Sequence, residues 1–105
     1  MRIVNYNNNN HLDDGIELAE FFYIRLHYKS DEQIVNIYNR EYDIIPEYNK
    51  VQFYLFIMLD RIFNTRFDKS PIIIGKNNMK VELLGKVILI KPNFINIIND
   101  GLKKV

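Results

Sequence analysis

Cysteine is absent from the 105 residues of this sequence, and histidine occurs only twice. Without thiols the chain forms no disulfide, holds no thiolate zinc site and uses no cysteine nucleophile. No feature calls for an oxidising compartment, and the first ten residues lack the apolar core of a secretory signal. We therefore expect a cytoplasmic protein.

Glycine is also scarce, with four residues in the whole chain. The sequence contains no glycine-rich phosphate loop, no Gly-x-Ser-x-Gly nucleophile motif and no His-Glu-x-x-His zinc motif. An enzyme of this composition would have to act through carboxylates, tyrosine or lysine, and no spacing points to such a reaction. The sequence therefore predicts a non-enzymatic protein with no cofactor.

Long apolar runs are missing as well, since the longest is the seven residues "FYLFIML" at 53–59. A helix that spans a bilayer needs about 20 predominantly apolar residues, and this run is closed by Asp60 and Arg61. We predict no membrane span. Seven residues make about two helical turns, so every face of this helix is apolar. It must be the central helix of the protein, or pack on the core with one side and on another chain with the other.

A single alanine, Ala19, stands against 14 asparagines and 17 isoleucines. Asparagine, isoleucine, lysine and tyrosine are encoded by AT-rich codons. The bias therefore indicates an AT-rich bacterial, phage or viral source, and it indicates nothing about mechanism.

The net charge of +1 hides a strong asymmetry between the two parts of the chain. Residues 1–60 contain five basic and ten acidic residues, a balance of −5, whereas residues 61–105 contain nine basic and three acidic residues, a balance of +6. Segregated charge of this kind is a property of surfaces that select partners electrostatically.

The first part of the chain reads as one short strand followed by helices. "SDEQ" at 30–33 is a capping box, with Ser30 as N-cap and Gln33 three residues later. Pro46 suits the first turn of a further helix. We predict a loop at 7–10, a strand at 2–6, and helices at 13–28, 31–40 and 46–64.

After Ser70 the period of the apolar residues changes from that of helices to that of strands. In "MKVELL" the side chains of Met79, Val81 and Leu83 alternate with Lys80 and Glu82, the pattern of a half-buried strand. The third strand is apolar on both faces and is predicted to be central. We predict strands at 71–75, 79–84 and 86–92 in an antiparallel meander with turns at "GKNN" and Gly85.

"PNFINIINDGLKKV" at 92–105 is predicted as a short C-terminal helix, although "FINII" can instead extend a strand. The fold class predicted is α+β in a single domain of residues 1–105. Its three-stranded meander, or four strands with the N-terminal one, is packed by three helices and the short C-terminal helix.

Three polar groups are candidates for a chemical site. "HLDD" at 11–14 places one imidazole beside two carboxylates, which could hold a metal or act as an acid/base pair, but Asp13 or Asp14 also suits a helix cap. His27 and Glu20 share a polar stripe, where histidine is commonly only half-buried. Asp60 and Arg61 interrupt the apolar helix, and we predict that the helix reaches solvent there.

Two charged surfaces are candidates for partner binding, and the sequence does not choose between them. The basic one consists of Lys76, Lys80, Lys86 and Lys91, and the acidic one of Asp13, Glu17 and Glu20. A solvated lysine-rich sheet edge is the alternative explanation of the first. The surplus of apolar residues leads us to expect self-association, as a homodimer, through part of helix 13–28 or helix 46–64.

The leading functional hypothesis is a small non-enzymatic protein that binds another protein, as an inhibitor or immunity-type, anti-defence factor of a phage or mobile element. The alternative is a nucleic-acid-binding protein that uses its basic second half. Three helices followed by a hairpin are also the order of a winged helix, but a third helix that is apolar throughout its centre is unsuited to reading base edges. A metal-dependent hydrolase built on His11, Asp13 and Asp14 is the third possibility.

Overall fold

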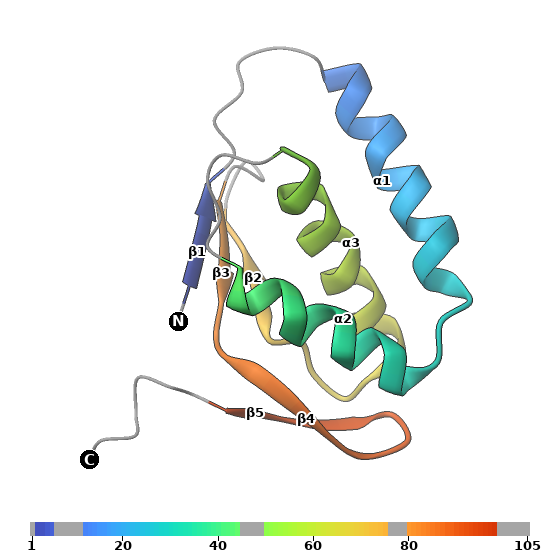
Figure 1. Ribbon diagram of the computed structural model, residues 1–105, viewed down its shortest axis with the longest axis vertical. Coiled ribbons are helices and arrows are strands. Elements are labelled where there is room, and N and C mark those ends of the chain that lie inside the picture. The colour runs from blue at the N-terminus through green and yellow to red at the C-terminus, as the bar shows by residue number, and fades with distance from the viewer. Residues whose placement is uncertain (1, 6–11, 45–49, 76–79, 99–105) are drawn as a thin grey trace.

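The computed structural model of the protein describes the backbone of residues 2–5, 12–44, 50–75 and 80–98, and the side chains at 3, 17–44, 51–75 and 80–98 (Figure 1). One strand is followed by three helices and then by four strands in this part of the chain. The bounds are β1 Arg2–Asn5, α1 Leu12–His27, α2 Asp31–Asp43, α3 Lys50–Arg66, β2 Ile72–Ile74, β3 Lys80–Leu83, β4 Lys86–Lys91 and β5 Phe94–Ile98. The predicted α+β class is confirmed.

Helix α3 is the central helix of the structure, and Figure 1 shows it between α1 and the strands β1, β2 and β3. Most of its apolar run is buried in the protein's own core, including Phe53, Phe56, Leu59 and Phe63, while Tyr54 and Ile57 on another side are only partly buried. This answers the question raised by the unbroken apolar stretch. Of the two alternatives for that helix, the central position is the observed one.

Helix α2 begins at the predicted capping box. The backbone N–H of Gln33 donates to Ser30 Oγ at 3.1 Å, and the backbone N–H of Ser30 donates to Gln33 Oε1 at 2.9 Å. The helix runs three residues further than predicted, because Tyr42 continues the buried stripe of Ile34, Val35 and Tyr38. Local capping and apolar spacing therefore place this helix correctly.

The first sheet has three strands in the order β1-β3-β2, all antiparallel. The predicted N-terminal strand is confirmed as an edge strand, with Ile3 opposite Glu82. Val81 and Leu83 of β3 are buried while Lys80 is exposed, so the predicted alternation is confirmed where it is described. This sheet packs against α3 with its inner face.

The predicted meander is wrong, because β4 leaves the first sheet and pairs with β5 instead of β3. A third strand of the meander would use its backbone N–H and C=O groups to pair with β3. In β4, side chains of α2 bind some of these groups instead. Asn39 Nδ2 donates to the Val87 carbonyl and Asn39 Oδ1 accepts from the Val87 N–H, each at 2.9 Å. Tyr38 Oη donates to the Gly85 carbonyl at 2.7 Å. Strand β4 is therefore not central, and its Ile88 and Ile90 are about half exposed.

The predicted C-terminal helix is also wrong, since Phe94–Ile98 is the strand β5. Asn93 has a φ of 73° at the turn between β4 and β5, and proline followed by a residue of positive φ is the pattern of a type II turn. The Ile95 N–H donates to Asp68 Oδ1 at 3.1 Å, which holds the strand and lowers the pKa of that carboxyl below its ordinary value. Burial of Ile95 between exposed Phe94 and Asn96 shows the alternation of a strand.

Several predictions fall on residues that the structure does not describe. They are the loop at 7–10, the helix start at Pro46, most of the "GKNN" turn and the inward position of Met79. Within the described ranges, no helix has the length and apolarity needed to cross a membrane.

Candidate functional site

The outward face of α1 carries apolar side chains that the core does not cover. Ile24 is 61% exposed, Phe21 50% and Tyr28 82%, whereas Leu26 on the opposite face of the helix is buried. We name this outward surface the α1 surface, and it consists of Glu17, Glu20, Phe21 and Ile24 of α1 together with Tyr28, which directly follows the last helical residue, His27. An apolar cluster of this kind on an otherwise folded protein marks an interaction site.

The spacing of these residues explains why they share one face. Positions 17, 21, 24 and 28 are separated by alternating steps of four and three residues, which place side chains in one stripe along a helix. Phe22 and Leu26 point the other way and pack on the core. Helix α1 is therefore apolar on two sides, and among the described residues only one of these sides packs on the core. The four-three spacing is visible in the sequence.

Two of the three residues of the predicted acidic surface, Glu17 and Glu20, lie together on the α1 surface. Glu17 and Glu20 are both exposed on the α1 surface, and neither forms an ion pair with a described residue. The side chain of Asp13 lies outside the described residues. The Arg25 guanidinium lies 4.8 Å from the centroid of the Phe21 ring and forms no ion pair with a described carboxylate. The α1 surface is therefore both apolar and acidic.

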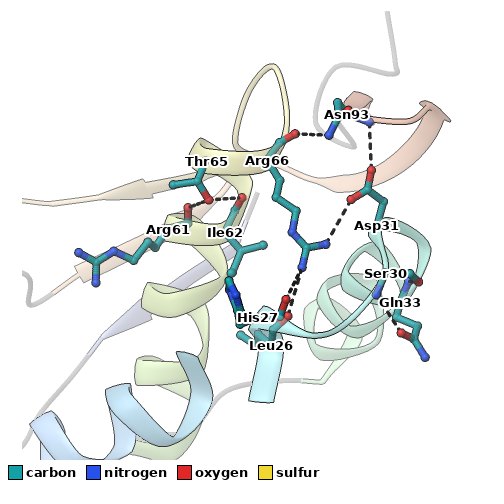
Figure 2. Close-up of polar contacts among 10 residues, drawn as sticks. All are labelled: Leu26, His27, Ser30, Asp31, Gln33, Arg61, Ile62, Thr65, Arg66 and Asn93. Atoms are coloured by element: carbon teal, nitrogen blue, oxygen red, sulfur yellow. Dashed lines mark hydrogen bonds and ion pairs between the residues drawn. The ribbon is translucent and has the colours of Figure 1, made fainter. Parts of the chain in front are cut away.

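A groove runs along the junction of α1 and α3, beside the α1 surface. Its larger part has a volume of about 420 Å³ and its lining residues are Ala19, Glu20, Tyr23, Ile24, Met58 and Arg61. A second depression of about 240 Å³ shares Tyr23 and Arg61 with the first and extends to His27 and Thr65. The Arg61 side chain is exposed, as predicted, and Figure 2 shows its guanidinium directed away from the other labelled residues. The groove thus adds a cation that has no ion-pair partner in the described ranges, next to the acidic surface.

Asp60, the neighbour of Arg61, is half-buried and satisfied within the molecule. Ser70 Oγ donates to Asp60 Oδ1 at 2.7 Å and Asn64 Nδ2 donates to the same oxygen at 3.0 Å. Burial raises the pKa of Asp60 above its ordinary value, and the two hydrogen bonds oppose the shift. This carboxylate joins α3 to the segment before β2, so its role is structural.

His27, which shares a polar stripe with Glu20, is exposed and packs against aromatic rings. Its ring stacks on Tyr23 with centroids 5.5 Å apart, and its edge meets Tyr28 at 5.1 Å. No hydrogen bond or ion pair joins the described side chains of His27 and Glu20, which lie two helical turns apart. The imidazole is part of an aromatic row along the groove.

A polar cluster around Arg66 fixes the end of α1 on α3 (Figure 2). The Arg66 guanidinium donates to the Leu26 and His27 carbonyls at 3.4 and 3.0 Å and to Asp31 Oδ1 at 3.2 Å. Asn93 donates through its backbone N–H to Asp31 Oδ2 at 3.0 Å and through Nδ2 to the Arg66 carbonyl at 2.7 Å. A cation at the last carbonyls of a helix is favourable, so this cluster orients the α1 surface.

The lysines predicted as one basic surface are dispersed. Lys80 lies in the three-stranded sheet and pairs with Glu82 at 3.4 Å, while Lys86 begins β4 and pairs with Asp43 at 2.8 Å. Lys91 ends β4, where its Nζ lies 4.7 Å from the centroid of the Phe94 ring. Lys76 lies outside the described residues. Among the described lysines after residue 60, only Lys91 has no described carboxylate within ion-pair distance.

The outer face of the β4–β5 hairpin is a second exposed apolar surface. Its inner face packs on the core, and Ile95 is buried there. We name the outer face the hairpin surface, and it consists of Lys86, Ile88, Ile90, Lys91, Phe94, Asn96 and Ile98. The sequence prediction missed it because "FINII" was assigned to a helix. The Pro92-Asn93 pair before an alternating segment is the signal that indicates the hairpin.

The possible metal site cannot be built from the described residues. His11 and the side chains of Asp13 and Asp14 lie outside them, and no group of three histidines or carboxylates able to hold a metal occurs among the residues that the structure describes. The metal-dependent hydrolase therefore gains no support from the geometry.

Comparisons with protein-family models, with curated proteins and with solved structures return no match. The exposed surfaces of the protein are therefore the basis on which a function can be assigned.

Proposed function

We propose that this protein is a non-enzymatic factor that binds another protein through the α1 surface. The observation that carries the proposal is the exposed stripe of Phe21 and Ile24 on a helix whose other face is already packed, continued by Tyr28 directly after the helix ends. Exposed aromatic side chains cost solubility, and aromatic anchors dominate the binding energy of many interfaces.

The geometry of the stripe indicates how the partner is engaged. Residues at positions i, i+3 and i+7 of a helix are the anchors that fit an apolar groove on a partner. Glu17 and Glu20 flank the apolar anchors, so a complementary groove has a basic rim. The partner class that fits is a protein with an apolar groove bordered by lysine or arginine.

An inhibitor or immunity-type, anti-defence factor of a phage or mobile element is the role that we assign to this binding. Its support is the small size of the chain, the segregated charge and the absence of a catalytic motif in the sequence. A charged contact surface accelerates association with the target and disfavours wrong partners. Fast, selective binding is what an inhibitor of this kind needs.

The experiment that tests the proposal is affinity capture from a lysate of an AT-rich bacterial host, with nuclease present. The wild-type protein, an Ile24→Lys variant and an Ile73→Lys control are compared. Ile73 is 46% exposed on the outer face of the first sheet and lies opposite Glu82, so a lysine there is tolerated. We expect the wild type and the control to retain the same protein and Ile24→Lys to lose it. Equal capture by all three would refute the assignment of the α1 surface.

A second candidate function, nucleic-acid binding, is supported by Lys91. Its ammonium group has no described carboxylate partner and lies against the exposed ring of Phe94. A cation beside an aromatic ring on a β-ribbon suits a phosphate and a stacked base. Binding to single-stranded DNA that weakens steeply with salt, and is lost in Lys91→Glu, is the expected result. Salt-insensitive or undetectable binding would exclude this function.

A further inference from the structure

The two exposed apolar surfaces carry charges of opposite sign. The α1 surface combines Phe21, Ile24 and Tyr28 with two glutamates, and the hairpin surface combines isoleucines and Phe94 with Lys86 and Lys91. The apolar residues of the two surfaces can therefore pack together while their opposite charges attract. The opposite charges of the two surfaces agree with the charge balance of the chain, which is negative over residues 1–60 and positive over residues 61–105.

The two surfaces cannot satisfy one another within a single molecule. Helix α1 has its inner face on α3, β4 has its inner face on α2, and both outer faces are directed to solvent (Figure 1). Glu17, Glu20 and Lys91 have no described partner for their charges, and Ile24 and Ile90 are each more than half exposed. A second molecule is needed to bring the two surfaces together.

We propose that the α1 surface of one molecule binds the hairpin surface of a second copy of the same chain. Phe21, Ile24 and Tyr28 then cover the exposed isoleucines and the ring of Phe94. The glutamates of α1 approach Lys91, which has no carboxylate partner among the described residues, and Lys86, whose charge is shared with Asp43 at 2.8 Å. Apolar burial supplies the affinity and the opposite charges fix the orientation.

Head-to-tail contact of this kind has a consequence that a symmetric dimer lacks. Each bound molecule still offers one free α1 surface or one free hairpin surface, so assembly continues as the concentration rises until a ring closes or a chain forms. Added salt weakens the contact because the paired charges lie at the surface. The second copy and the partner protein proposed above compete for the α1 surface, although neither interaction requires the other.

Pairing of two α1 surfaces is the alternative assembly, and the charges disfavour it. Such an interface brings Glu17 and Glu20 of both copies together. Of the described bases close to the stripe, Arg25 lies against the Phe21 ring and Arg61 lines the groove beside Glu20. Like charges that face one another are destabilising. The asymmetric contact places each glutamate near a lysine instead.

Two variants that each block one surface provide the test. Glu20→Lys with Ile24→Lys reverses the α1 surface, and Ile88→Glu with Lys91→Glu reverses the hairpin surface; all four positions are exposed. Ile73→Lys, on the first sheet, is the matched control. Sedimentation velocity between about 10 and about 500 µM measures the mass, and the far-UV circular dichroism of each variant verifies its fold.

We expect the wild type and the control to rise above the monomer mass of 12.6 kDa with concentration. Each double variant alone stays monomeric. A mixture of the two double variants forms a complex of about twice the monomer mass and nothing larger, because one intact surface of each kind remains. This reconstitution is the result that only head-to-tail contact produces.

Three results would overturn the proposal. The first is a wild type that stays monomeric at the highest concentration. The second is a hairpin variant that forms dimers alone, which would indicate pairing of two α1 surfaces, and the third is a mixture of the two variants that remains monomeric. The hairpin variant keeps the α1 surface intact, so it still captures the partner protein if the proposed function holds. Failure of self-association and failure of partner binding are therefore distinguishable.

Discussion

Helices α1 and α3 lie side by side and are both rich in apolar residues, but they use these residues differently. Phe63 of α3 is fully buried, because α3 has α1 on one side and strands on the other. Phe21 of α1 is half exposed, because only one face of α1 meets the core. Apolar sequence therefore stabilises the fold in α3 and is left available for binding on the outer face of α1.

The largest difference between the two helices is expected from removal of a phenylalanine in each. Phe63→Ala leaves a cavity beside Tyr38 and Phe67, whose rings lie 5.5 and 5.2 Å from that of Phe63. We expect it to lower the free energy of unfolding by about 3–5 kcal/mol. Phe21→Ala should lower it by less than about 1 kcal/mol. Urea unfolding measures both, and equal losses would show that the outer face of α1 belongs to the core.

A smaller effect is expected where α1 is fastened to α3. Arg66→Met removes the donors that the Leu26 and His27 carbonyls and Asp31 now share. We expect a loss of about 2 kcal/mol in the free energy of unfolding, because bonds to partly buried charged groups are lost.

Arg66→Lys is the matched control. It keeps the positive charge but lacks the planar guanidinium, which donates both to Asp31 and to the carbonyls at the end of α1. An intermediate loss is expected for it. If Arg66→Met unfolds at the same urea concentration as the wild type, the contact with α1 does not depend on this cluster.

The smallest effect is expected at Asp60, the acidic residue of the otherwise apolar part of α3. Its pKa is raised by burial, so the protonated form is favoured in the folded state. A raised folded-state pKa contributes stability at acid pH that is lost as the pH rises through that pKa. Asp60→Asn removes this dependence, because the amide is never charged.

We expect Asp60→Asn to be as stable as the wild type at pH 7 or more stable by less than about 1 kcal/mol. The difference should shrink as the pH falls below the folded-state pKa, because wild-type Asp60 is then neutral too. Urea unfolding of both proteins between pH 3 and pH 7 measures it. If Asp60→Asn is less stable than the wild type, and by the largest margin at pH 7, then the charged form of Asp60 is the one that favours folding.

Features that depend on neighbours in the chain could be predicted. The capping box of α2 consists of residues three apart, and the alternation in β3 follows from the pleat of a strand. The candidate surfaces were predictable only in part. Glu17 and Glu20 follow from helical spacing, but the dispersion of Lys80, Lys86 and Lys91 depends on which strands pair.

The amino-acid sequence by itself determined the three helices before residue 70 and the α+β class, because capping and apolar periodicity act over a few residues. Only the tertiary structure decided that β4 pairs with β5 and that the outer face of α1 stays exposed. Asn39 and Tyr38 bind the backbone of Val87 and Gly85 across 48 and 47 residues of sequence. Hydrogen bonds between residues so far apart in the sequence depend on how the helices and strands pack against one another, and local sequence patterns do not specify that packing.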